Sequence, residues 1–159
     1  MESHYADARV RLASHRNVIL AVWWDAPRIE QMQQFREVLM LLRERHPEGI
    51  GGISTVVGGT PSFPADVRTE SAKLTSEALL DFGLAHIMLM GGLAGTAVRA
   101  FLATMLLLGR SKQLTKVFDK EDLGVDWVAE QMAAKGVACD KAAVMAALAQ
   151  VHEMGPGSD

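Results

Sequence analysis

Residues 17–57 read NVILAVWWDAPRIEQMQQFREVLMLLRERHPEGIGGISTVV, and this stretch decides the fold class of the chain. It begins and ends with short β-favouring runs, at residues 17–24 and 50–57. Between them, after the start signals Asp25 and Pro27, apolar side chains recur at helical spacing. A helix that joins two strands of one sheet makes them parallel neighbours, so the stretch predicts an α/β fold. The apolar helix positions are Ile29, Met32, Phe35, Val38, Leu39 and Leu42.

Upstream of this unit, a further strand is expected. Residues 9–12 form another β-favouring run, and the short polar segment 13–16 separates it from residues 17–24. A connection of this length is typical of antiparallel neighbours, so the two runs predict a hairpin.

Downstream, strands and helices continue to alternate. Residues 50–57 are followed by an amphipathic helix opened by Pro64, and residues 84–90 are continuously apolar, which is typical of a strand covered on both faces. A helix from Thr96 to residue 108, a strand at residues 114–118 and two helices capped near Asp122 and Asp140 complete the chain. We therefore expect a mixed, mostly parallel five-stranded sheet with helices packed on it, in one domain of residues 1–154, and a disordered tail at residues 155–159.

Composition excludes several classes of protein. The 159 residues are 49% hydrophobic and carry a formal net charge of only -3, which gives one core but no basic field for nucleic acid. The single cysteine, Cys139, rules out an intrachain disulfide, and the polar start of the chain lacks the apolar core of a signal peptide. These features predict a cytoplasmic location.

One apolar stretch, residues 84–108, has the length of a membrane span. His86 and Arg99 lie inside it, and three glycines divide it into a strand-length and a helix-length piece. We therefore expect no membrane insertion.

The order and lengths of these elements over residues 8–135 resemble the STAS fold of anti-sigma-factor antagonists. Residues 117–128, VFDKEDLGVDWV, also resemble the end of bacterial STAS-like domains, where a last strand leads through an acidic turn to a Trp-bearing helix. The resemblance implies a protein-binding switch that is controlled by a phosphorylated serine between the third strand and the second helix. At that place this chain has GGTPSFP (58–64), with Thr60 and Ser62 as its only hydroxyls and no acidic residue before them, so the phosphorylation motif is not matched.

Two glycine-bearing turns, each from a strand into a helix, are candidate ligand sites. The first contains Gly59, Thr60 and Ser62, and the second contains Gly91, Gly92 and Thr96. Such turns lie at the edge of an α/β sheet where backbone N–H groups favour an anion. Neither turn matches a phosphate-binding motif. Glycines in such turns are more commonly required because the backbone adopts a conformation that other residues disfavour.

Three further residues are candidates for a partner surface or a core role. Trp23 and Trp24 are adjacent on a strand and must point to opposite faces, so Trp24 is a candidate contact with a partner. Arg99, inside an apolar helix, is either a long side chain that reaches the surface or an anchor for an acidic partner or an anionic ligand near the Gly91 turn. His86 is expected to be a neutral core histidine.

No residue pattern indicates catalysis. The histidines are scattered, no metal-ligand spacing occurs, and there is no nucleophile motif. The sequence therefore predicts a non-enzymatic protein-interaction or regulatory domain without a cofactor, which binds another protein and possesses enough apolar surface to form a homodimer. The alternative is a small-molecule or nucleotide-binding domain, or an enzyme, that uses the Gly58 and Gly91 turns.

Overall fold

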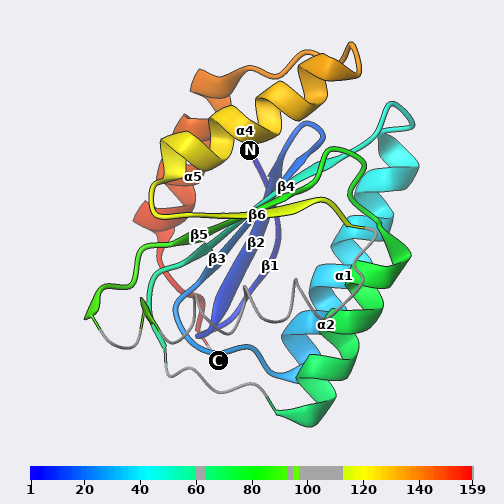
Figure 1. The fold of residues 1–159 in the computed structure, drawn as a ribbon. Helices are drawn as coiled ribbons and strands as arrows, with labels where there is room; N and C mark the ends of the chain where they lie inside the picture. The colour runs from blue at the N-terminus through cyan, green and yellow to red at the C-terminus, as the bar shows by residue number, and fades with distance from the viewer. Residues whose placement is uncertain (60–63, 93–94, 97–112, 159) are drawn as a thin grey trace.

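The computed structural model describes residues 1–59, 64–92, 95–96 and 113–158, and they form an α/β fold around one mixed sheet (Figure 1). The sheet has six strands whose spatial order follows the chain. The first three strands are antiparallel neighbours, and the last four, from β3 onward, are parallel. The strands are β1 (Glu2–Ala6), β2 (Val10–His15), β3 (Val18–Trp23), β4 (Gly51–Val56), β5 (Leu84–Met88) and β6 (Thr115–Phe118).

Helices cover both faces of the sheet. One face carries α1 and α2, and the other carries α4 and α5, as Figure 1 shows. Each face therefore has its own apolar core. The helices that lie wholly within the described residues are α1 (Ile29–Arg45), α2 (Ala65–Glu77), α4 (Glu121–Ala134) and α5 (Lys141–Met154).

The central strand β3 explains why two cores form. Its six residues, Val18–Trp23, are all buried, as expected for a strand covered on both sides. Ile19, Ala21 and Trp23 belong to the core under α1 and α2. The alternate residues Val18, Leu20 and Val22 belong to the core under α4 and α5.

The prediction of five strands is wrong, because the chain begins with a sixth. β1 pairs antiparallel with β2 at the edge of the sheet. An edge strand with exposed residues such as Glu2 and Ser3 lacks the apolar alternation by which strands are recognised in a sequence. The position of the hairpin turn also differs: β2 continues through residues 13–15, and the connection to β3 is only Arg16 and Asn17.

The two C-terminal helices occur close to where they were expected, but α4 begins at Glu121 after Lys120, so Asp122 lies inside the helix and does not cap it. The apolar side chain of Leu123 is 45% exposed, whereas the neighbouring Gly124 is buried. A Cβ atom at Gly124 would lie 2.8 Å from Cδ1 of Ile87, so α4 approaches β5 closely at this residue. Asp140 caps α5 as predicted, because its carboxylate accepts a hydrogen bond from the N–H of Ala143 at 3.0 Å.

The end of the chain contacts its beginning. The carbonyl of Gly155 accepts a hydrogen bond from Nε of Arg11 at 2.9 Å, and the N–H of Gly157 donates to the carbonyl of Asp7 at 2.7 Å. These contacts bring the end of α5 to the turn between β1 and β2.

Candidate functional site

The connections that follow the parallel strands meet at one edge of the sheet. Residues 24–28 follow β3, residues 57–59 follow β4, residues 89–92 follow β5 and residues 119–120 follow β6. In open α/β sheets the carboxyl ends of the strands form the edge at which ligands and partners bind. We call this the carboxyl edge.

Two of the predicted site residues, Trp24 and Gly59, lie at this edge. Trp24 is half-buried on the side of α4 and α5, whereas Trp23 is buried on the opposite side, so the prediction that they point to opposite faces is confirmed. The rings of Trp24 and His152 meet edge to face, with centroids 6.5 Å apart. Gly59 is exposed and has a φ of +105°, a conformation that L-residues rarely adopt.

The second glycine turn is only partly within the described residues. Gly91 and Gly92 are exposed, and a Cβ atom on either would meet no described heavy atom within 4 Å. The predicted cap Thr96 is not at the start of a helix: Gly92 and Gly95 are already helical, and the Thr96 hydroxyl donates to the Gly92 carbonyl at 3.1 Å. The candidates Thr60, Ser62 and Arg99 lie outside the described residues.

A polar cluster that the sequence did not predict joins three elements at this edge. The buried Thr55 of β4 donates from its hydroxyl to Oε1 of Glu121 at 3.1 Å, and Nε2 of His152 lies 2.7 Å from the same oxygen. Glu121 begins α4 and His152 lies in the last turn of α5. Residues 31 positions apart give no signal of such a contact in the sequence.

The chemistry of this cluster is structural rather than nucleophilic. A serine- or threonine-type nucleophile needs a base that accepts its proton and a path for substrate. Here the hydroxyl of Thr55 is fully buried and bonds to the carboxylate, not to the imidazole. The cluster instead holds the start of α4 and the end of α5 against β4.

A double-mutant cycle measures that role. For Glu121→Gln and His152→Asn, we expect a coupling free energy of about 1 kcal/mol in urea unfolding at neutral pH, because both groups are mostly buried. The matched control is the pair Lys141 and Asp126, which has the same 2.7 Å separation but side chains that are both 52% exposed. For that pair we expect less than about 0.5 kcal/mol, and equal couplings would contradict the argument.

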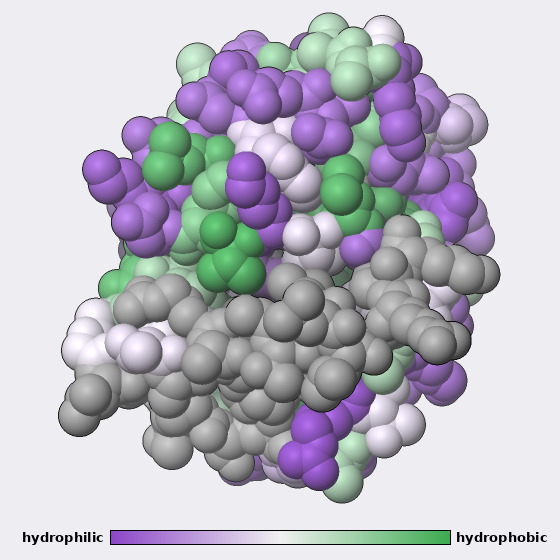
Figure 2. Space-filling view, in the orientation of Figure 1, coloured by the Kyte–Doolittle hydropathy of each residue, from purple (hydrophilic) through white to green (hydrophobic). Residues whose placement is uncertain are grey.

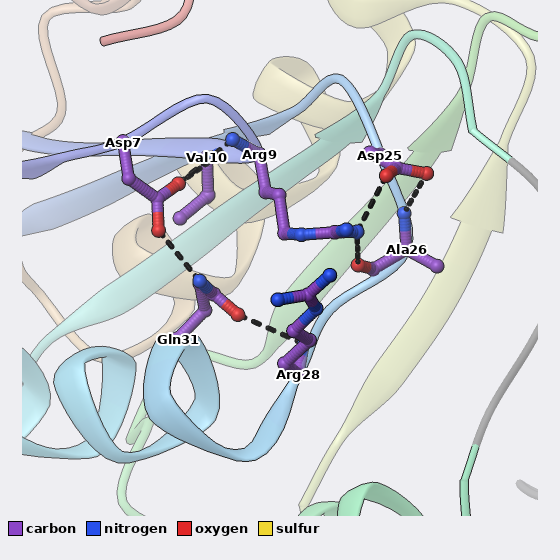
Figure 3. Close-up of polar contacts among 7 residues, drawn as sticks. All are labelled: Asp7, Arg9, Val10, Asp25, Ala26, Arg28 and Gln31. Atoms are coloured by element: carbon purple, nitrogen blue, oxygen red, sulfur yellow. Dashed lines mark hydrogen bonds and ion pairs between the residues drawn. The ribbon is translucent and has the colours of Figure 1, made fainter. Parts of the chain in front are cut away.

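A second polar network lies beside the start of α1 (Figure 3). Oδ1 of Asp7 accepts the backbone N–H groups of Arg9 and Val10, and Oδ2 accepts hydrogen bonds from the Tyr5 hydroxyl and the Gln31 amide. Burial raises the pKa of Asp7, but the hydrogen bonds from Gln31, Tyr5 and the backbone outweigh it, so the net pKa lies below its ordinary value. The carboxylate of Asp7 thus fixes the turn between β1 and β2 on α1.

The same network joins the loop after β3. Nη1 of Arg9 donates to the carboxylate of Asp25 and, at 2.9 Å, to the carbonyl of Ala26. Arg28 is exposed, and its backbone N–H donates to Oε1 of Gln31 at 2.9 Å, as Figure 3 shows. Because two aspartates accompany the two arginines, this network is balanced in charge and is not an anion site.

Apolar side chains remain exposed around the carboxyl edge. Leu89, which follows β5, is 42% exposed, and Leu123 in the first turn of α4 is 45% exposed. Met154 at the end of α5 is 46% exposed. Together with the half-buried Trp24 and His152, these residues form what we call the carboxyl-edge surface.

Residues 1–59, 64–92, 95–96 and 113–158 contain no candidate metal site and no candidate membrane span. No three histidine, cysteine, aspartate or glutamate side chains are grouped there in a way that could hold a metal ion. Within the same ranges, no helix has both the length and the apolarity to cross a bilayer. Comparisons of the chain with protein-family models, curated proteins and solved structures found no match.

Proposed function

We propose that this chain is a non-enzymatic protein-interaction or regulatory domain of STAS-like element order, and that its partner docks on the carboxyl-edge surface. The observation that carries the proposal is that Leu89, Leu123 and Met154, which lie in segments at the carboxyl edge of the sheet, are all exposed. Removing apolar surface from water when a partner binds is favourable by about 25 cal/mol per Å². Tryptophan and methionine, both present on this surface, are enriched in the cores of protein interfaces.

The polar contacts behind this surface support the proposal. The link from Thr55 through Glu121 to His152 positions the start of α4 and the end of α5, on which Leu123 and Met154 lie. A surface whose backbone is already fixed loses little conformational entropy when a partner binds.

A charge-reversal experiment tests the proposal. The double variant Leu89→Asp, Leu123→Asp is expected to lose a partner that wild type recovers by affinity purification from the cell of origin, because two carboxylates would have to be desolvated at the contact. The matched control is Met40→Asp, since Met40 is 47% exposed on the outer side of α1. The control should retain the partner, and retention by the double variant would refute the docking site.

The alternative function, a small-molecule or nucleotide-binding domain, has one observation in its favour. The turn at Gly91 and Gly92 is open, with no described atom near either position of an added Cβ. A ligand at 100 times its dissociation constant adds about 2.7 kcal/mol to the free energy of unfolding. A thermal-shift screen with nucleotides, acidic metabolites and lipids therefore separates the two functions: a reproducible shift favours the ligand, and its absence favours the protein partner.

A further inference from the structure

The last strand of the sheet, β6, lies at one edge of the sheet. In the described part of the chain, β6 neighbours only β5. The N–H of Leu84 donates to the carbonyl of Leu114 at 2.9 Å, which fixes the orientation of this parallel ladder. Since backbone groups alternate in direction along a strand, those of Lys116 point toward β5. Those of Thr115 and Val117 point away from it, and no strand of the described residues pairs with them.

Apolar and aromatic side chains border this edge. Leu114 is 51% exposed, and the half-buried rings of Phe118 and Trp127 lie with centroids 5.8 Å apart. Figure 2 shows separate hydrophobic patches on this face, over β6 and α4, with hydrophilic atoms between them. Nζ of Lys116 lies 5.3 Å from the centre of the Phe118 ring, so Lys116 and Phe118 share the face that carries α4.

The opposite edge of the sheet is protected in a way that β6 is not. The register of β1 shifts between Ser3 and Tyr5, and such a bulge disturbs pairing with a further strand. Glu2 at its start is held by Arg45 at 2.8 Å. An added strand would therefore meet a regular edge only at β6.

We propose that a second copy of the chain pairs antiparallel with β6, so that two six-stranded sheets join into one. A two-fold axis perpendicular to the sheet leaves each face of the sheet on the same side. Since opposed residues of an antiparallel pair share a face, the residue at the axis must lie opposite its own copy. The N–H and C=O groups of Val117 point away from β5, so Val117 and its copy can exchange two hydrogen bonds at the axis. This interface is separate from the carboxyl-edge surface, so either proposal can fail without the other.

The side chains are self-complementary in this register. With Val117 opposite itself, Lys116 of one copy lies opposite Phe118 of the other, which repeats across the dimer the cation–π contact made within one chain. Thr115 then lies opposite Asp119 of the other copy, a hydroxyl beside a carboxylate. The exposed Leu114 and the half-buried Trp127 flank the axis and lose solvent contact.

Cysteine cross-linking tests the register directly. In a Cys139→Ala background, Val117→Cys is expected to form a disulfide-linked dimer under mild oxidation, because opposed residues in a hydrogen-bonded pair have Cα atoms about 5.5 Å apart. Lys116→Cys should cross-link much less, since two Lys116 residues lie on a diagonal of about 7–8 Å. Equal cross-linking, or preference for Lys116→Cys, overturns the proposal.

Sedimentation of the full chain tests the interface without cross-linking. Wild type is expected to show a monomer–dimer equilibrium, and Val117→Pro is expected to be monomeric because it removes the central N–H donor while leaving the bonds to β5 intact. Val117→Thr keeps the donor and should dimerise like wild type. A wild-type chain that stays monomeric at the highest concentration reached overturns the proposal, as does a Val117→Pro dimer; circular dichroism confirms that each variant is folded.

Discussion

Acidification from pH 7 to pH 4 is expected to remove up to about 3 kcal/mol of the free energy of unfolding through one side chain, His86. This residue lies in the middle of β5, between Ser54 of β4 and Val117 of β6. Its side chain is half-buried, and desolvation lowers its pKa from 6.5 to about 4. The interval between those values corresponds to about 3 kcal/mol, at about 1.4 kcal/mol per pH unit.

The direction of the effect follows from proton linkage. In the unfolded chain His86 binds a proton near its ordinary pKa of 6.5, whereas in the folded protein it does so only near pH 4. Between these pH values the unfolded state binds more protons, so stability falls as the pH is lowered. The contribution is complete above pH about 6.5 and lost below about 4.

The measurement is urea unfolding at a series of pH values between 4 and 7. His86→Gln should flatten the pH dependence in this interval relative to wild type. Burial also lowers the pKa values of His4 and His15, but both remain in the variant and cancel in the comparison. Ile53→Val serves as control: it removes one methylene from the buried core under α4 and α5, lowering stability without changing the pH dependence. Equal pH dependence in wild type and His86→Gln would show that His86 is not the linked group.

The contrast between β3 and β1 shows which strands a sequence can predict. The six residues Val18–Trp23 are apolar because both faces are covered, and the pattern marks them without any tertiary information. β1 has the residues of an exposed segment, because its strand conformation depends on pairing with β2 and not on its own composition. Edge strands of this kind are therefore missed by periodicity.

The candidate site shows the same limit. Trp24 and the glycine turns were found because a strand-to-helix connection has a local signature. The contact between Glu121 and His152 depends on how α5 crosses α4, which residue spacing does not encode. Apolar residues such as Leu123 are usually buried, and the exposure of Leu123 is visible only from the packing of Gly124 on β5.

Gly59→Ala is expected to lower the free energy of unfolding by about 3 kcal/mol or more, a combination of backbone strain and steric overlap. The φ of Gly59 is +105°, where a side chain is strained whatever the surrounding space. In addition, a Cβ atom there would lie 2.7 Å from Cα of Asp25 and 2.8 Å from the backbone nitrogen of Ala26. Backbone atoms cannot yield as a flexible side chain can, so the loops after β3 and β4 would have to separate.

The matched control is Gly91→Ala, at the corresponding position of the other glycine turn. The φ of Gly91 is not in the left-handed region, and no described heavy atom lies within 4 Å of its added Cβ, so we expect a change within about 1 kcal/mol. Chemical denaturation of both variants gives the comparison. A large loss at Gly59 with little change at Gly91 would mean that the first glycine turn exists for the close approach of two loops, which weakens its reading as an anion site. If Gly59→Ala is instead as stable as wild type, the close approach of the two loops is not the reason for a glycine at this position. That result would favour ligand binding at the first glycine turn.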